Sequence, residues 1–412
     1  MKPAAILFCA AALPRLAYLL LIHPPTESQY WALSGSLVRT GTFTIDGLPV
    51  TDFEPLYPLF LAGARLIARD SVLAVQLLQI AVASLGAVLL YWLVLDRTRS
   101  ARAGVFAGLL FAGYPLLVRH AATVSDSSLT TVLLVGFAGA AVSIAGVASA
   151  AIAGAWLGLS VLSRAMVLPL IALVGAVLVR RGQARDAAVV AGVAMLLVLP
   201  WWIRNHRANG SWWPTRSGIN LFIGNSPYTA ALLPDYDLDL LEPVAYEWAT
   251  TARPDIVPGS ADYIPRVDAY LTSAAIEHMK ASPIRTITEK LANVGYFLSP
   301  RLIPLYISGP ETRVALAPPD TVVVEAPVIR PRIEVISHTL AASFVMLAAV
   351  VGIYKRRHVL SRDFSLWAIA CVFVVVYAVY VPATRYRAPM EFVFFFYAAV
   401  ALARVPERRD GV

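Results

Sequence analysis

Long apolar runs separated by short polar turns dominate most of the chain. The first run covers residues 3–22, and about 20 residues in a helix measure about 30 Å, the thickness of a bilayer core. Further apolar runs occupy 72–95, 103–118, 129–147, 149–162, 166–179, 187–203, 333–354, 364–381 and 390–403. The pattern predicts an all-α polytopic membrane protein with about ten transmembrane helices.

Two stretches interrupt this alternation. In residues 23–71 apolar positions recur at helical spacing over lengths too short for a span, which predicts juxtamembrane helices in a first outer loop. Residues 204–332 form a long polar insert rich in proline and tryptophan. We therefore expect an N-terminal transmembrane module over 1–203, an insert over 204–332 and a C-terminal transmembrane module over 333–412.

Basic clusters mark one side of the predicted membrane topology. They lie at 97–102, 180–185, 355–362 and 404–409, and the ten spans bring all four to the side of the N-terminus. Because cytoplasmic loops are enriched in lysine and arginine, both termini are expected to be cytoplasmic. The first loop, the insert and the turn at 382–389 then lie outside the cytoplasm.

Arg15 interrupts the first apolar run. A charged side chain at that depth is costly in lipid, so Arg15 is expected to face protein or water.

The composition excludes several classes of protein. The 412 residues are 58% hydrophobic and 15% charged, whereas a soluble domain carries roughly a quarter charged residues. The net charge of +8 comes from short clusters between apolar runs, which does not predict a nucleic-acid partner. Both cysteines, Cys9 and Cys371, lie inside apolar runs, so a disulfide framework is excluded. The sequence contains no His/Cys spacing typical of a zinc site. No phosphate-binding glycine motif precedes a helix.

Three carboxylates on the predicted outer side are candidates for catalysis. Glu27 follows the first span, Glu54 precedes a short helix at Pro55, and Asp126 precedes the fourth span. Each alone is better read as an ordinary helix-start charge. Brought together they would raise at least one pKa, which suits a general base.

Arginines on the same side are candidates for binding a phosphate. Arg385 and Arg387 flank Tyr386 between the last two spans, where the positive-inside rule disfavours basic residues. Paired guanidiniums match phosphate geometry, and Arg204 and Arg164 end on the same face. Tyr30, Tyr57 and Tyr386 stand beside these groups in the sequence and are expected to contact the rest of the substrate. Together these groups suggest group transfer from a phosphorylated lipid.

At these residues the chain resembles the GT-C membrane glycosyltransferases, specifically glycosyltransferase family 39 and its bacterial aminoarabinose-transferase-like members. The matching pieces are ESQY at 27–30, FEPLYPLFL at 53–61, SD at 125–126, LSR at 162–164, PWWIRN at 200–205, GNSP at 224–227 and RYRAP at 385–389. Each piece is short, and their order and spacing together carry the resemblance over nearly the whole length.

The resemblance implies an inverting transferase that moves a sugar from a polyprenyl-phosphate carrier to a lipid, glycan or protein hydroxyl. It also implies that the first loop supplies the acids, that arginines bind the carrier phosphate, and that the protein is integral to a bacterial plasma (inner) membrane. One departure concerns the base. The family places an aspartate four residues before the tyrosine that matches Tyr30, and here Thr26 stands there beside Glu27.

Two other readings stay open. A transporter or flippase for lipids or polyprenyl phosphate would use the same phosphate-binding groups, and the departure at Thr26 is compatible with a catalytically inactive GT-C pseudoenzyme. No cofactor is expected with certainty, because carboxylates of this kind suit Mg²⁺ or Mn²⁺ as well as a metal-free reaction. The sequence does not identify the sugar, the acceptor or the length of the carrier.

Overall fold

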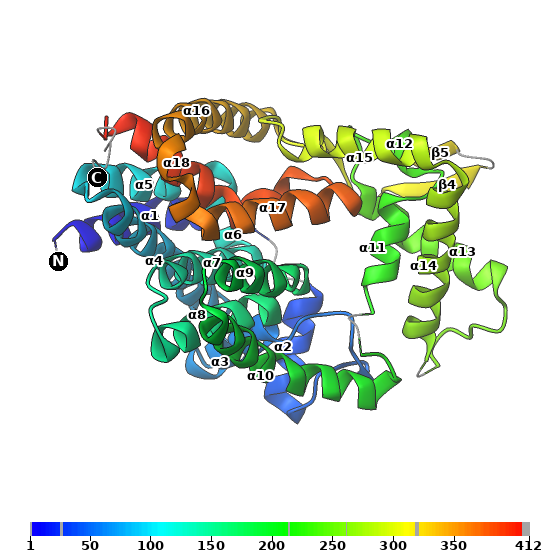
Figure 1. Cartoon of the computed structure of the whole chain (residues 1–412). Coiled ribbons are helices and arrows are strands. Elements are labelled where there is room, and N and C mark those ends of the chain that lie inside the picture. Colours follow the sequence, from blue (N-terminus) through cyan, green and yellow to red (C-terminus); the bar gives the residue numbers. More distant parts are fainter. Residues whose placement is uncertain (1, 25–27, 213–214, 261, 318–320, 406–412) are drawn as a thin grey trace.

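The computed structural model describes residues 2–24, 28–212, 215–260, 262–317 and 321–405. This part of the chain is almost entirely helical (Figure 1). The helices up to the insert are α1 (Lys2–Ile22), α2 (Gln29–Thr40), α3 (Leu56–Ile67), α4 (Val72–Thr98), α5 (Ala101–Gly113), α6 (Pro115–Ala122), α7 (Ser127–Val142), α8 (Val147–Ser163), α9 (Pro169–Arg180) and α10 (Ala184–Asn209).

The later helices are α11 (Ser217–Gly224), α12 (Thr229–Leu232), α13 (Leu241–Ala252), α14 (Tyr263–Ala281), α15 (Pro283–Phe297), α16 (Arg332–Arg356), α17 (Phe364–Val379) and α18 (Glu391–Leu402). Short 3₁₀ segments are η1 (Ala165–Val167), η2 (Leu238–Leu240), η3 (Arg357–Asp363) and η4 (Thr384–Met390). Antiparallel pairs join β1 (Thr44–Ile45) to β2 (Leu48–Pro49), β3 (Tyr306–Ile307) to β6 (Val328–Ile329), and β4 (Arg313–Ala317) to β5 (Thr321–Glu325).

The protein is an all-helical polytopic membrane protein. Among the described residues, four helical stretches are long and apolar enough to cross a bilayer, namely Lys2–Ile22, Val72–Thr98, Ala184–Asn209 and Arg332–Val379, and the bent pair α5–α6 is a further candidate. The other predicted spans correspond to shorter helices. At 16 residues, for example, α7 measures about 24 Å, less than the hydrocarbon core. The count of ten therefore stays a prediction.

Small residues let the helices of the bundle approach closely. Gly154 and Gly158, one turn apart in α8, face α10, and a Cβ on them would lie 2.7 Å and 2.9 Å from the carbonyl oxygens of Val190 and Ala194. Gly352 of α16 lies against α18 in the same way. Because lipid offers no hydrophobic drive between helices, such close backbone contact is a main source of packing energy in a membrane.

Arg15 faces protein, as expected, and is fully buried. Its guanidinium donates to the carbonyl oxygens of Phe111 and Ala112 at the last turn of α5. Pro115 begins α6 after a bend of 57° and has no N–H to donate to Phe111. Arg15 therefore satisfies carbonyls that the break in the helix exposes.

Three of the predicted cytoplasmic basic clusters meet at one end of the bundle. Arg97, in the last turn of α4, donates to the carbonyl of Arg362, and Arg181, after α9, donates to the carbonyl of Ser361. Arg356 forms a bidentate ion pair with Asp363 in the same turn. These contacts agree with the predicted grouping of the clusters on one side. Which side of the membrane that is stays a prediction.

The insert contains its own apolar core. Residues from α11, α13 and α14, among them Phe222, Leu241 and Leu271, are buried together with Val381 and Ala383 of the turn before η4. The insert is thus anchored on the segment that connects α17 to α18, and Figure 1 shows it extending to one side of the helical bundle.

We expect Gly352→Ala to destabilise the protein, because its Cβ would lie 1.8 Å from the Tyr397 carbonyl oxygen. Overpacking of this kind typically costs about 1–3 kcal/mol. The matched control is Gly192→Ala in α10, where a Cβ meets nothing within 4 Å. This variant should be neutral or slightly stabilising, because alanine favours the helix. Thermal unfolding of both variants in detergent measures the difference, and equal melting temperatures would contradict the packing described.

Candidate active site

A cavity of about 780 Å³ lies where the first outer loop, the insert and the C-terminal module meet. Its wall combines α2 and the loop before α3, the turn between α6 and α7, the segment after α8, the start of α11, η2, the end of α17 and the start of η4. Of the predicted site residues in the described part of the chain, six line it: Tyr30, Glu54, Asp126, Arg164, Arg385 and Tyr386. Segments up to about 350 residues apart in the sequence, all predicted on one side of the membrane, thus meet at one cavity.

Glu54 differs from the other acids of the cavity. Its Oε1 accepts a hydrogen bond of 2.9 Å from the backbone N–H of Ala165, and no basic side chain of the described residues forms an ion pair with it. Burial raises the pKa of Glu54 to about 7, and the nearby charge of Asp126 raises it further against the lowering effect of the Ala165 hydrogen bond. Glu54 is therefore a carboxylate that exchanges a proton near neutral pH.

Asp126 is held firmly by Arg164. The guanidinium spans both carboxylate oxygens, with Nε at 2.8 Å from Oδ2 and Nη2 at 2.5 Å from Oδ1. Arg164 also donates to Ser127 Oγ and to the Tyr377 hydroxyl. Both carboxylate oxygens of Asp126 are thus occupied by one guanidinium. Asp126 therefore fits the role of orienting Arg164 better than that of a base.

Arg216 is a second cavity cation, one that the sequence reasoning missed. It pairs with Glu242 at 2.6 Å and stands 3.7 Å from Asp52 of the first loop. Its position follows from the start of α11, where Asp268 of α14 accepts hydrogen bonds from the backbone N–H groups of Gly218 and Ile219.

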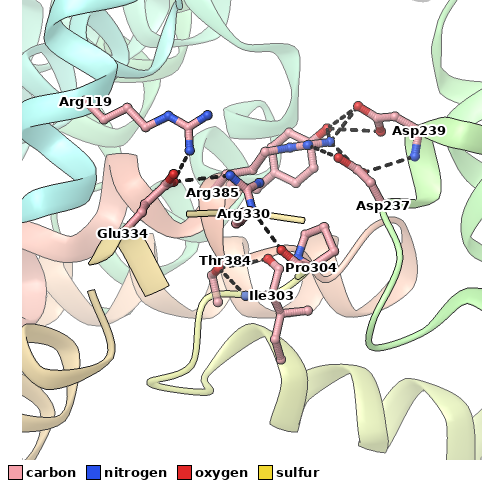
Figure 2. A network of polar contacts seen from close by, with 10 residues as sticks. Arg119, Asp237, Asp239, Ile303, Pro304, Arg330, Glu334, Thr384 and Arg385 are labelled. Carbon is pink, nitrogen blue, oxygen red and sulfur yellow. Dashed lines mark hydrogen bonds and ion pairs between the residues drawn. The ribbon is translucent and has the colours of Figure 1, made fainter. Parts of the chain in front are cut away.

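Arg385 is the third cavity cation and is shared between two aspartates of the insert. It pairs with Asp237 and, at 2.5 Å, with Asp239, and it donates to the Tyr386 hydroxyl at 3.0 Å. Figure 2 shows Asp237 and Asp239 converging on this guanidinium from the insert. Burial and the neighbouring acids Asp237 and Glu242 raise the pKa of Asp239 against the opposing effect of Arg385.

The segment that carries Arg385 is fixed by further polar contacts. Thr384 exchanges hydrogen bonds with the backbone of Ile303, and Arg330 donates to the carbonyl of Pro304. Figure 2 shows Arg330 and Arg119 meeting at Glu334 beside this segment. These contacts tie the start of η4 to the chain that enters α16, so Arg385 is held in place from two directions.

The structure corrects the prediction for Arg387. It does not line the cavity, and it is fully buried in an ion pair with Glu391, 2.6 Å away. Its Nη1 donates to the carbonyl oxygen of Phe297, the last residue of α15, and to that of Ser299, two residues later. Arg387 is two residues from Arg385, but the tight 3₁₀ turn of η4 sends the two side chains to different surroundings.

Arg204 and Tyr57 also stand outside the cavity lining, contrary to prediction. Arg204 donates to the carbonyl oxygens of Val50 and Phe43, so it holds the first loop against α10. Tyr57 is buried and donates to Gln79 Oε1 at 2.6 Å. Its ring supports Tyr30 edge-on at 5.0 Å. Both residues therefore stabilise the wall.

The predicted catalytic residue Glu27 lies outside the described residues, as does Thr26. The described chain resumes at Ser28, which caps α2 and lines the cavity.

His120, Asp52, Asp239 and Tyr377 line the cavity without having been predicted to do so. The Nε2 atom of His120 is buried with no hydrogen-bond partner among the described residues, so it is available to a polar substrate atom. The sequence could have indicated Asp52 as a site residue, because it stands two residues before Glu54 in the first loop. No sequence feature indicated Asp239 or Arg216, because both come from the insert, where no motif marks functional residues.

The cavity's acids do not form a cluster suited to a metal ion. In the described part of the chain no three His, Cys, Asp or Glu side chains gather closely enough to hold one. Mg²⁺ commonly binds through one or two carboxylates together with substrate phosphate.

Comparison with known proteins finds solved structures with a similar fold. No protein-family model matches the chain, and no curated protein matches its sequence. Two solved structures of ArnT from Cupriavidus metallidurans are similar to it over 97% of its length. The apo structure gives a TM-score of 0.42 at 16% identity and is covered over 77% of its chain; the undecaprenyl phosphate complex gives 0.44 at 15% identity and is covered over 78%. What the present chain binds has to be inferred from its own residues.

The raised pKa of Glu54 predicts a dependence of stability on pH. The folded protein holds this proton more tightly than the unfolded chain, so Glu54 stabilises the fold below about pH 4.5, and this contribution is lost as the pH rises to about 7. Glu54→Gln should flatten the decline in unfolding free energy over that interval. Chemical unfolding in detergent at several pH values measures it. Glu247→Gln, at an exposed position of α13, should leave the decline unchanged.

Proposed function

We propose that this protein is a membrane glycosyltransferase. It moves a sugar from a polyprenyl-phosphate carrier to a hydroxyl of a lipid, glycan or protein acceptor, with inversion at the sugar carbon. The observation that carries the proposal is one cavity in a bilayer-spanning protein where Glu54, which forms no ion pair with an arginine of the described residues, stands near three arginines. Three cations suit a phosphate, and a carboxylate with a pKa near 7 suits the removal of a hydroxyl proton.

The arginines are the groups that would hold the carrier phosphate. Arg164, Arg216 and Arg385 come from three different parts of the chain and are each oriented by carboxylates. An arginine side chain that is already held in place loses less conformational entropy when it binds the phosphate. Arg216 is the most available of the three, because one of its two acidic partners, Asp52, stands at 3.7 Å, beyond hydrogen-bond distance. Tyr30 and Tyr386 line the cavity and are the candidates for contact with the sugar.

The reaction is a single displacement. The acceptor oxygen bonds to the anomeric carbon from the face opposite the phosphate as the carbon–oxygen bond to the phosphate breaks. Glu54 accepts the acceptor's hydroxyl proton, and the bonding electrons leave with the carrier phosphate. Arginines stabilise the negative charge that develops on this leaving group.

Glu54 takes the role of base in preference to the acids expected from the sequence. Asp126 is committed to Arg164 through both oxygens, whereas Glu54 accepts a single backbone hydrogen bond. Glu27 lies outside the described residues and keeps its place as a candidate beside Glu54. In this assignment Asp126 acts on the phosphate through Arg164.

The topology supports a position for the site outside the cytoplasm. Every segment that lines the cavity belongs to a loop or helix end predicted on the side opposite the basic clusters. We infer an integral protein of the bacterial plasma (inner) membrane, with cytoplasmic termini and an extracytoplasmic active site.

A transporter or flippase for polyprenyl phosphate is the rival function. Transporters place their substrate sites near the bilayer midplane, between repeated halves. Here the polar groups gather at helix ends, beside an insert that has no counterpart elsewhere in the described chain. Release of free polyprenyl phosphate only when an acceptor is present distinguishes transfer from transport, and a catalytically inactive protein would release none.

We expect Glu54→Gln to reduce sugar transfer by about 10²- to 10⁴-fold, the range of a general base, with donor binding retained. In the unaltered protein kcat should rise with pH through about 7, because Glu54 must be deprotonated to accept a proton. The assay follows transfer from a radiolabelled sugar lipid in proteoliposomes. Full activity of the Gln variant, with the same pH profile, would exclude Glu54 as the base.

We expect Arg216→Gln to weaken donor binding by about 10- to 100-fold, because a charge-assisted hydrogen bond is worth about 1.5–3 kcal/mol. The effect should appear mainly in KM for the donor. Arg207→Gln is the control, since Arg207 is an exposed arginine at the end of α10. Size-exclusion profiles establish that each variant is folded. Equal donor affinities for both variants would show that Arg216 does not touch the phosphate.

A further inference from the structure

Helix α15 belongs to the insert, yet its amphipathic pattern is reversed relative to a helix in water. Three large aliphatic side chains of one face are mostly exposed: Ile284 at 79%, Ile287 at 61% and Leu291 at 66%. Their spacing of three and four residues places them in one stripe. We call Ile284, Ile287 and Leu291 the outer stripe.

Two polar side chains of α15 point the other way, whereas Arg285 stays exposed at the edge of the helix. Lys290 Nζ donates to the carbonyl oxygen of Gly224 at 2.8 Å, and Asn293 Nδ2 donates to the carbonyl of Ala378 at 2.9 Å. Arg285 and Glu289 pair with each other at 2.7 Å. In a helix that faces water, lysine and asparagine are normally exposed and leucine is buried. Polar groups turned toward protein and aliphatic groups turned away are typical of a helix in lipid.

The inner face of α15 packs on the end of a membrane-crossing stretch. Phe297 is fully buried and stacks on Tyr377 of α17, with the ring centroids 5.3 Å apart. One turn earlier, Asn293 reaches Ala378. Figure 1 shows α15 beside the end of α17. Because α17 has only 16 residues, about 24 Å of helix, it is shorter than the hydrocarbon core, and α15 continues the protein surface past its end.

We propose that α15 is embedded in the bilayer through the outer stripe and contacts lipid at the level of the membrane interface. The packing of α15 on the end of α17 identifies lipid as the occupant, and the inward bonds of Lys290 and Asn293 keep their polar groups off the outer stripe. Thr288, exposed beside the stripe, donates to the carbonyl oxygens of Ile284 and Arg285 within the helix. The insert is therefore attached to the membrane by a helix as well as through the connection between α17 and α18. The proposal is independent of the catalytic assignment.

A direct test places a fluorophore on the stripe. In a chain with Cys9→Ser and Cys371→Ser, the variants Ile287→Cys and Leu291→Cys are labelled with NBD and reconstituted singly in lipid nanodiscs. Ser273→Cys, at an exposed position of α14 in the same insert, is the water-facing control. Leu347→Cys, where Leu347 is 71% exposed on the membrane-crossing α16, is the lipid-facing control.

We expect lipids carrying a doxyl group at carbon 5 to quench NBD at 287 and 291 at least threefold more than at 273, and aqueous iodide to show the opposite order. Quenching by iodide at 287 and 291 to the extent seen at 273 would overturn the proposal. Protection from both quenchers would also overturn it, since the stripe would then be covered by protein. The matched labelling of position 347 shows whether the doxyl group reaches the protein surface.

Discussion

Pairing of buried arginines with acids is the interaction on which the site depends. A guanidinium cannot lose its charge under ordinary conditions, so an arginine taken out of water must be matched by carboxylates or carbonyl oxygens. At the cavity the match is made by Asp126, Glu242 and the pair Asp237–Asp239, on Arg164, Arg216 and Arg385 respectively. These pairs join the N-terminal module to itself, the insert to itself, and the insert to the C-terminal module.

The pairing of arginines with acids also explains why Glu54 differs from the other acids of the cavity. Each arginine of the wall has an acid of its own, whereas no arginine of the described residues forms an ion pair with Glu54, which accepts a hydrogen bond from the Ala165 N–H. Burial disfavours the carboxylate form and, against the lowering effects of this hydrogen bond and of Arg164, raises the pKa of Glu54 to about 7. A set of paired charges therefore produces two kinds of group in one cavity: arginines that are oriented in advance, and an acid poised to exchange a proton.

Arginines away from the cavity perform a structural task that the sequence disguises. Arg15, Arg204 and Arg387 all donate to backbone carbonyl oxygens, at a broken helix, at the first loop and at the end of α15. Irregular backbone inside or beside a bilayer leaves carbonyls that water cannot reach, and a long cationic side chain is an efficient donor to them. The motif RYRAP shows both uses within three residues, since Arg385 faces the cavity and Arg387 supports the turn.

Hydrophobic periodicity by itself determined that the chain is an all-helical membrane protein, with the juxtamembrane helices α2 and α3 in the first loop, because apolar length is a local property that lipid reads directly. Together with the basic clusters, it predicted Glu54, Asp126, Arg164 and Arg385 on one side of the membrane. Only the tertiary structure decided that Arg387 and Arg204 lie outside the cavity, that Arg216 and Asp239 enter it from the insert, and that α15 turns its aliphatic face outward. Those outcomes depend on which distant carbonyl or carboxylate each side chain meets after folding, and the spacing of residues along the chain does not contain that information.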